Sequence, residues 1–216
     1  MIQGLDLFQK HFAGFENNYI MIGGTACVLA MNEVGVEFRA TKDLDMVLTL
    51  EAIDGQFAVA LWDFVKAGGY STYQRSLGKD AFYRFHTPEN KNYPFMIELF
   101  SRNPGIVLTE GAHLTPIPWE SINDDEAKSL SAILMDEDYY NFIHLGKTIT
   151  NGISTIPATH LIPLKALAWV DNFRRRQAGE QVDEKVVKKH RNDIIRLYQL
   201  ITPDTKIGLP ERIKQD

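Results

Sequence analysis

Two aspartates, Asp43 and Asp45, are the residues whose type and spacing most clearly suggest chemistry in this chain. Two positions apart on a β-strand, their side chains point to one face, while Leu44 and Met46 point to the other. Like charges held this close are unfavourable unless a cation lies between them. Oxygen ligands of this kind suit Mg²⁺ or Mn²⁺, which bridge to substrate phosphates. The pair therefore predicts a divalent-metal site.

A second motif, Gly23-Gly24-Thr25, directly follows the short apolar run from Tyr19 to Ile22. A strand that ends in two glycines and passes into a helix exposes backbone N–H groups at the helix N-terminus, and such groups bind phosphate. Glycine lets a ligand approach the backbone closely, and the Thr25 hydroxyl adds a donor. The motif predicts a phosphate site, with the metal bridging it to the aspartates. An ordinary tight turn is the alternative.

Glu98 is a third candidate metal ligand because it interrupts the apolar run from Phe95 to Phe100. A charge buried in such a strand is costly without a partner. If this strand lies beside the one that carries Asp43 and Asp45, three carboxylates converge within about 8 Å and can hold one or two metals. The alternative is that Glu98 faces solvent at a sheet edge.

The elements expected to position these residues alternate between helices and strands. Helices are predicted where apolar residues recur every three to four positions, and strands where short segments are rich in β-branched and aromatic residues. The predicted helices are Leu5–Phe15, Ala26–Glu33, Ala52–Ala67, one opening at Pro163, and Val182–Ile201. The predicted strands are Tyr19–Ile22, Asp43–Leu48, Tyr70–Arg75, Ala81–His86, Tyr93–Phe100 and Tyr139–Ile149.

This succession predicts an α/β (α+β) fold with helices packed on a sheet. A helical part is expected to begin near Leu161, which divides the chain into a core of residues 1–160 and a C-terminal helical part of residues 161–216. The tail after Thr205 is expected to be loosely held.

The composition is typical of a soluble globular protein. Of 216 residues, 44% are apolar and 24% charged, which excludes a disordered chain, a collagen and a coiled-coil rod. No apolar run approaches the roughly 20 residues of a membrane-spanning helix, and the N-terminus does not resemble a signal peptide. The single cysteine, Cys27, excludes an internal disulfide, so a reducing cytoplasm is the expected setting.

Charge is unevenly distributed along the chain. Residues 160–216 hold 12 Lys and Arg against 8 Asp and Glu, whereas residues 1–159 hold the remaining 11 and 20. An acidic front and a basic back suit metal binding in one part and phosphate binding in the other, or are simply two solvated surfaces. Arg174-Arg175-Arg176 is either a solvated helix end or a patch for a nucleic-acid substrate.

The segment GGTACVLAMNEVGVEFRATKDLDMVL resembles the nucleotidyltransferase superfamily of the DNA polymerase β type, and within it the AbiEii-type toxins of type IV toxin–antitoxin systems. Their pattern is a Gly-Gly-Thr-Ala turn, a helix, and a Thr-x-Asp-x-Asp strand preceded by a basic residue. The matching residues are Gly23, Gly24, Thr25, Ala26, Arg39, Thr41, Asp43 and Asp45. Two C-terminal helices extend the resemblance through Lys165 and Asp193.

The resemblance implies a nucleotidyltransferase-like mixed sheet and a reaction that moves a nucleotidyl group from an NTP to an acceptor. Asp43, Asp45 and Glu98 would hold the metal, Lys165 would contact nucleotide phosphates, and Asp193 would belong to the cleft. Nucleotide-binding roles extend to the glycine turn, Arg39 and Thr41. Relatives of this type suggest tRNA or another RNA as the acceptor and a cognate antitoxin as a partner. The alternatives are a small-molecule (aminoglycoside-like) nucleotidyltransferase and a non-catalytic nucleotide-binding or protein-interaction module.

Overall fold

The computed structural model describes residues 2–49, 55–73, 81–101 and 136–216. The helices are α1 (Leu5–His11), α2 (Gly23–Glu33), α3 (Gly55–Gly68), α5 (Glu137–Leu145), α6 (Ala158–Gln177), α7 (Glu184–Tyr198) and α8 (Glu211–Gln215). The strands are β1 (Tyr19–Ile22), β2 (Asp43–Leu48), β3 (Ser71–Tyr73), β4 (Ala81–His86), β5 (Met96–Ser101), β6 (Thr148–Thr150) and β7 (Ile153–Thr155). No helix in these four ranges has the length and apolar character needed to cross a membrane.

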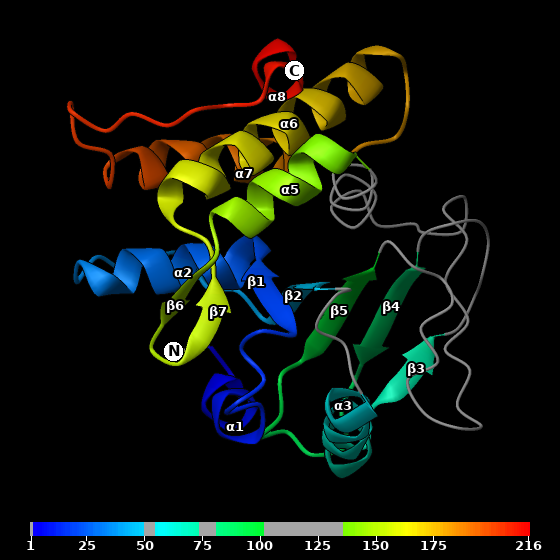
Figure 1. The fold of residues 1–216 in the computed structure, drawn as a ribbon. Coiled ribbons are helices and arrows are strands. Elements are labelled where there is room, and N and C mark those ends of the chain that lie inside the picture. Colours follow the sequence, from blue (N-terminus) through cyan, green and yellow to red (C-terminus); the bar gives the residue numbers. More distant parts are fainter. Residues whose placement is uncertain (1, 50–54, 74–80, 102–135) are drawn as a thin grey trace.

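Five strands form a mixed sheet in the order β1-β2-β5-β4-β3. The pair β2 and β5 is parallel, and the other neighbouring pairs are antiparallel. Figure 1 shows α1 and α3 beside one part of this sheet, with α5, α6 and α7 gathered at the opposite side. The predicted mixed sheet flanked by helices, with a helical C-terminal part, is therefore confirmed.

Side chains of β2 alternate between two apolar clusters, as the period of two in a strand requires. Leu44 and Met46 pack with the aromatic side chains of α1 and α3. Val47 instead packs with residues of α5, α6, α7 and α8. The second face also receives The two aspartates thus face the C-terminal helices.

The segment predicted as a strand, Tyr139–Ile149, is wrong, because its first part is the helix α5. Asp136 caps this helix by accepting hydrogen bonds from the N–H groups of Asp138 and Tyr139. Tyr139, Phe142 and Ile143 have a helical spacing, and all three are buried. Their aromatic and β-branched character favours a strand, but the cap and the spacing decide the outcome.

A two-stranded hairpin of β6 and β7 follows α5. Asn151 and Gly152 at its turn both have positive φ, 49° and 70°, the conformation that a type I′ hairpin turn requires. Thr155 Oγ1 donates a hydrogen bond to the Met21 carbonyl at 3.1 Å, which joins the hairpin to β1. The hairpin thereby leads the chain from the sheet to the C-terminal helices.

Helix α6 begins at Ala158 rather than at Pro163, which lies inside it. Pro157 is its N-cap residue, and Pro163 is close enough to the start that it removes only one early backbone hydrogen bond. The predicted division at 160/161 therefore falls within α6, and a separation into two parts stays a prediction. The tail is not loosely held, because α8 docks with Ile213 buried and Arg212 paired with Asp136.

The remaining boundaries differ from the predictions by a few residues. Helix α1 ends at His11, although Phe12 still packs in the core. Helix α7 is shorter at both ends than the predicted Val182–Ile201. Residues 52–54 of the predicted third helix and residues 74–75 of the predicted strand after it lie outside the described residues.

Candidate active site

Asp45 and Glu98 lie side by side at the centre of the sheet. They are direct partners in the parallel register of β2 and β5, and both are buried, with 5% and 3% of their surface exposed. The same register line continues to Ile22 on β1 and to Arg84 on β4. The predicted placement of Glu98 beside the aspartate strand is therefore confirmed, and a solvent-facing sheet edge is excluded.

The pKa of Glu98 is raised well above its usual range. Burial is the largest cause, and the neighbouring Asp45 carboxylate adds to it and shares a hydrogen bond with Glu98. Arg84 opposes the shift, donating from Nε to Glu98 Oε1 at 2.7 Å. Two carboxylates held together in this way favour either a shared proton or a bound cation.

Arg84 is a site residue that the sequence reasoning missed. It interrupts the run Ala81-Phe82-Tyr83-Arg84-Phe85-His86 in the same way that Glu98 interrupts its own strand. This signal was present in the sequence, but only the antiparallel register of β4 and β5 shows that the two charges meet.

Asp43 occupies the start of β2, half-buried and on the same face as Asp45. Among the described residues, no set of three or more His, Cys, Asp and Glu side chains is placed to hold a metal ion. The expected convergence of three carboxylates is thus met only by the pair Asp45 and Glu98. Mg²⁺ commonly uses one or two carboxylates together with water and substrate phosphates, so the pair, with Asp43 nearby, still fits such an ion.

The N-terminus of α2 lies against these carboxylates. Gly23 has a φ of 65°, and a Cβ at this position would overlap the Asp45 carboxylate. A Cβ on Gly24 would lie 2.6 Å from Thr41 Oγ1 and 3.6 Å from Arg39 Nη2. Both glycines are required here because neighbouring side chains occupy the space.

Helix α2 starts at Gly23, three residues before the predicted start at Ala26, and no side chain caps its N-terminus. Thr25 is fully buried, and its hydroxyl donates to the Asp43 carbonyl at 2.7 Å. Thr25 thus fastens α2 to β2 instead of presenting a free donor. The uncapped N–H groups and the helix dipole place partial positive charge close to Asp45, Thr41 and Arg39.

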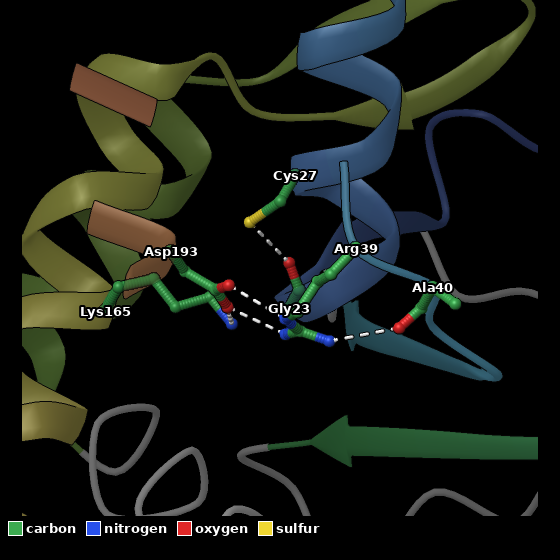
Figure 2. Close-up of polar contacts among 6 residues, drawn as sticks. All are labelled: Gly23, Cys27, Arg39, Ala40, Lys165 and Asp193. Atoms are coloured by element: carbon green, nitrogen blue, oxygen red, sulfur yellow. Dashed lines mark hydrogen bonds and ion pairs between the residues drawn. The ribbon is translucent and has the colours of Figure 1, made fainter. Parts of the chain in front are cut away.

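A buried ion cluster adjoins this helix terminus (Figure 2). Asp193 on α7 accepts two hydrogen bonds from Arg39, from Nε at 2.8 Å and from Nη2 at 2.7 Å, and lies 3.5 Å from Lys165 Nζ on α6. The exposed fractions of these side chains are 0% for Asp193, 4% for Lys165 and 22% for Arg39. Asp193 therefore holds two cations beside the start of α2.

The pKa of Asp193 is lowered from its ordinary value. Burial acts in the opposite direction, but the hydrogen bonds from Arg39 and the charge of Lys165 outweigh it. His190, expected at the surface, is also buried and adds to the positive potential at Asp193. Asp193 is thus an ionised, enclosed anion whose oxygens face its two cationic neighbours.

A chain of contacts connects the predicted site residues into one neighbourhood. Glu98 meets Asp45, Asp45 meets Gly23, and Thr25 meets Asp43. On the other side, Gly24 meets Thr41 and Arg39, which reaches Asp193 and Lys165. Cys27, expected in the core, is buried, and its Sγ bonds to the Gly23 carbonyl at 3.1 Å. Residues far apart in the chain therefore surround a single helix terminus.

Comparisons with known proteins place one name beside this geometry. No protein-family model matches the chain, and no curated protein matches it. Among solved structures, the chain is similar to an antigenic nucleotidyltransferase-like protein from Paracoccidioides brasiliensis. The two are 15% identical, the match covers 97% of this chain and 81% of that one, and the TM-score is 0.45. A likeness of this size does not assign a family.

Proposed function

We propose that the chain is a metal-dependent nucleotidyltransferase whose active site surrounds the N-terminus of α2. The observation that carries this proposal is the buried pair of Asp45 and Glu98, in register on adjacent parallel strands and in contact with Gly23. Paired buried carboxylates beside an uncapped helix terminus offer a cation site and a phosphate site next to each other.

Asp45, Asp43 and Glu98 would hold Mg²⁺ or Mn²⁺. When bound, the cation would neutralise charge on the triphosphate and orient it for in-line transfer. The N–H groups at the start of α2 would receive phosphate oxygens, and Thr41 and Arg39 border the same space. Lys165 adds positive charge, and Asp193 positions both cations through the contacts described above.

In the proposed reaction, an acceptor hydroxyl forms a bond to the α-phosphorus while the bond between the α-phosphorus and the bridging oxygen breaks. Pyrophosphate leaves, and the hydroxyl proton passes to a carboxylate of the Asp45–Glu98 pair. A raised carboxyl pKa favours such a proton acceptor near neutral pH. The rest of the catalysis is positioning and charge stabilisation.

For the acceptor we propose RNA, in the setting of an AbiEii-type toxin with a cognate antitoxin, as the motif resemblance implies. A non-catalytic nucleotide-binding module is the rival with a specific observation in its favour. Arg84 already compensates Glu98, and Asp193 already compensates Arg39 and Lys165, so the cluster is balanced without a ligand.

The test is incubation of the purified protein with Mg²⁺ or Mn²⁺, each α-labelled NTP in turn, and total RNA. The matched variants are Asp45→Asn, which keeps the shape of the side chain, and Asp63→Asn, which removes an exposed charge from α3. We expect label on an RNA species for the wild type and for Asp63→Asn, and a loss of about 100-fold or more for Asp45→Asn. Metal-dependent NTP binding without any labelled product would favour the non-catalytic module.

A further inference from the structure

A groove between α6 and α7 lies apart from the residues of the candidate active site. Its volume is about 470 Å³. The side chains that matter for its chemistry are Trp169, Phe173, Arg176, Glu184, Lys188 and Arg191. On each helix they recur at intervals of three or four residues, so they line the facing strips of an antiparallel helix pair.

The two aromatic rings are unusually open to solvent. Phe173 is 48% exposed, and Trp169 is half-buried. Four residues apart on α6, they share one face and are separated by about 6 Å along the helix axis. An exposed pair of rings of this kind offers two platforms on which planar groups can stack.

Positive charge surrounds the rings. Glu184 is the single carboxylate among the groove-lining side chains that the structure describes, and it contacts Lys188 at 2.6 Å and Arg176 at 3.6 Å. Arg191 forms no ion pair with any residue in the described part of the chain. Three cations against one carboxylate make the groove positive, although the chain as a whole has a net charge of −5.

We propose that this groove binds single-stranded nucleic acid, with bases stacked on Trp169 and Phe173 and phosphates held by Arg176, Lys188 and Arg191. Aromatic platforms combined with cations are the features by which proteins hold unpaired strands. An acidic protein segment fits less well, because its apolar side chains would need a continuous apolar floor. Two rings and three cations also exceed what one mononucleotide can use.

The position of the groove suggests which strand it holds. Trp169 lies one helical turn beyond Lys165 on α6, and positions four apart share a helix face. Under the proposed function, a strand in the groove is the acceptor; this assignment rests on that function, whereas binding of the strand does not.

The test measures fluorescence anisotropy of a labelled single-stranded RNA of about 12 nucleotides, with neither NTP nor metal present. The double variant Phe173→Ala/Arg191→Ala removes one exposed ring and one exposed cation from the groove. Its matched control is Val59→Ala/Lys66→Ala, which removes an exposed apolar side chain and an exposed cation from α3. We expect the groove variant to bind about tenfold more weakly or worse, and the control to bind like the wild type.

A second readout is the salt dependence of binding. Loss of one phosphate contact lowers the slope of log K against log salt by about 0.7 for a single strand, so the groove variant should show a flatter slope. Unchanged affinity in the groove variant would overturn the proposal. So would equal binding of duplex RNA, equal competition by free mononucleotide, or preferential binding of an acidic peptide that is lost in the same variant. Because the assay needs no transfer reaction, its failure is distinguishable from a failure of the proposed function.

Discussion

The decisive residues of the candidate site are charges that have been taken out of water in pairs. Asp45 lies against Glu98, which Arg84 compensates, and Asp193 compensates Arg39 and Lys165. A buried charge that loses its partner is far more costly than the intact pair is stabilising. Single substitutions here should therefore show clear effects on stability, which separate positioning from chemistry.

At this scale we predict that Asp193→Ala lowers the free energy of unfolding by about 3 kcal/mol, because it leaves Arg39 and the buried Lys165 without their anion. Urea denaturation at neutral pH measures this change. Asp204→Ala, which removes an exposed carboxylate near the C-terminus, is the control and should change stability by less than about 0.5 kcal/mol. Equal effects of the two substitutions would contradict the role given to Asp193.

The same carboxylate predicts a pH dependence. The pKa of Asp193 is lowered in the folded chain, so its contribution is present above the ordinary aspartate value of 3.8 and is lost as pH falls through the lower folded value. The stability difference between the wild type and Asp193→Asn should therefore be constant from pH 7 to about pH 5 and narrow below about pH 4. A difference that grows on acidification would show that the sign is wrong.

At the scale of elements, the glycine turn shows how a local sequence signal and a distant side chain combine. Gly23 needs its positive φ, and the Asp45 carboxylate also fills the space that a Cβ would take. Gly35 has a similar φ of 72°, but no atom of the described residues lies within 4 Å of the place that its Cβ would take. The two glycines therefore form a matched pair.

We predict that Gly35→Ala costs about 1–2 kcal/mol, the strain of a left-handed residue, whereas Gly23→Ala costs at least about 1 kcal/mol more, because a side chain must also move. Thermal or urea unfolding of both variants measures the difference. Nucleotide binding should fall in Gly23→Ala and stay unchanged in Gly35→Ala. Similar stability of the two variants would mean that the contact with Asp45 does not constrain the turn.

The sequence predicted the elements best where local signals agreed. The bounds of β1, β2 and β4 were predicted to the residue, because each apolar segment is bounded by glycine or charged residues. The segment Tyr139–Ile149 failed because aromatic content outweighed helical spacing in the interpretation. The order of the sheet could not be read from the sequence, since β2 pairs with β5 across more than 50 intervening residues. For the same reason Arg84 and the contact between Arg39 and Asp193 were not foreseen.

At the scale of the whole molecule, the sheet and the C-terminal helices share one apolar cluster. It contains Ile20 and Val47 of the sheet together with Leu164 of α6, Leu197 of α7 and Ile213 of α8. The cleavage of the chain into two independent parts at 160/161 would expose this cluster to water. Burial of this kind couples the folding of the parts that contribute to it.

We therefore predict a single cooperative unfolding transition, with coincident curves from far-ultraviolet circular dichroism and tryptophan fluorescence. Ile213→Ala should lower the stability of the whole molecule by about 2 kcal/mol, through the lost apolar contact in the buried cluster. Ile207→Ala, at a side chain 38% exposed, is the control and should have little effect. Two separate transitions would instead support a boundary between independent domains.

The central claim is that the Asp45–Glu98 pair and the start of α2 together bind a metal–nucleotide complex. The most direct measurement is Mn²⁺ binding, followed by electron paramagnetic resonance, with a non-hydrolysable nucleoside triphosphate present. We predict nucleotide-dependent Mn²⁺ binding by the wild type and by Asp63→Asn, and a loss of at least about tenfold in affinity for Asp45→Asn and Glu98→Gln. Equal Mn²⁺ affinity in all four proteins, or no nucleotide-dependent binding in the wild type, would contradict the account.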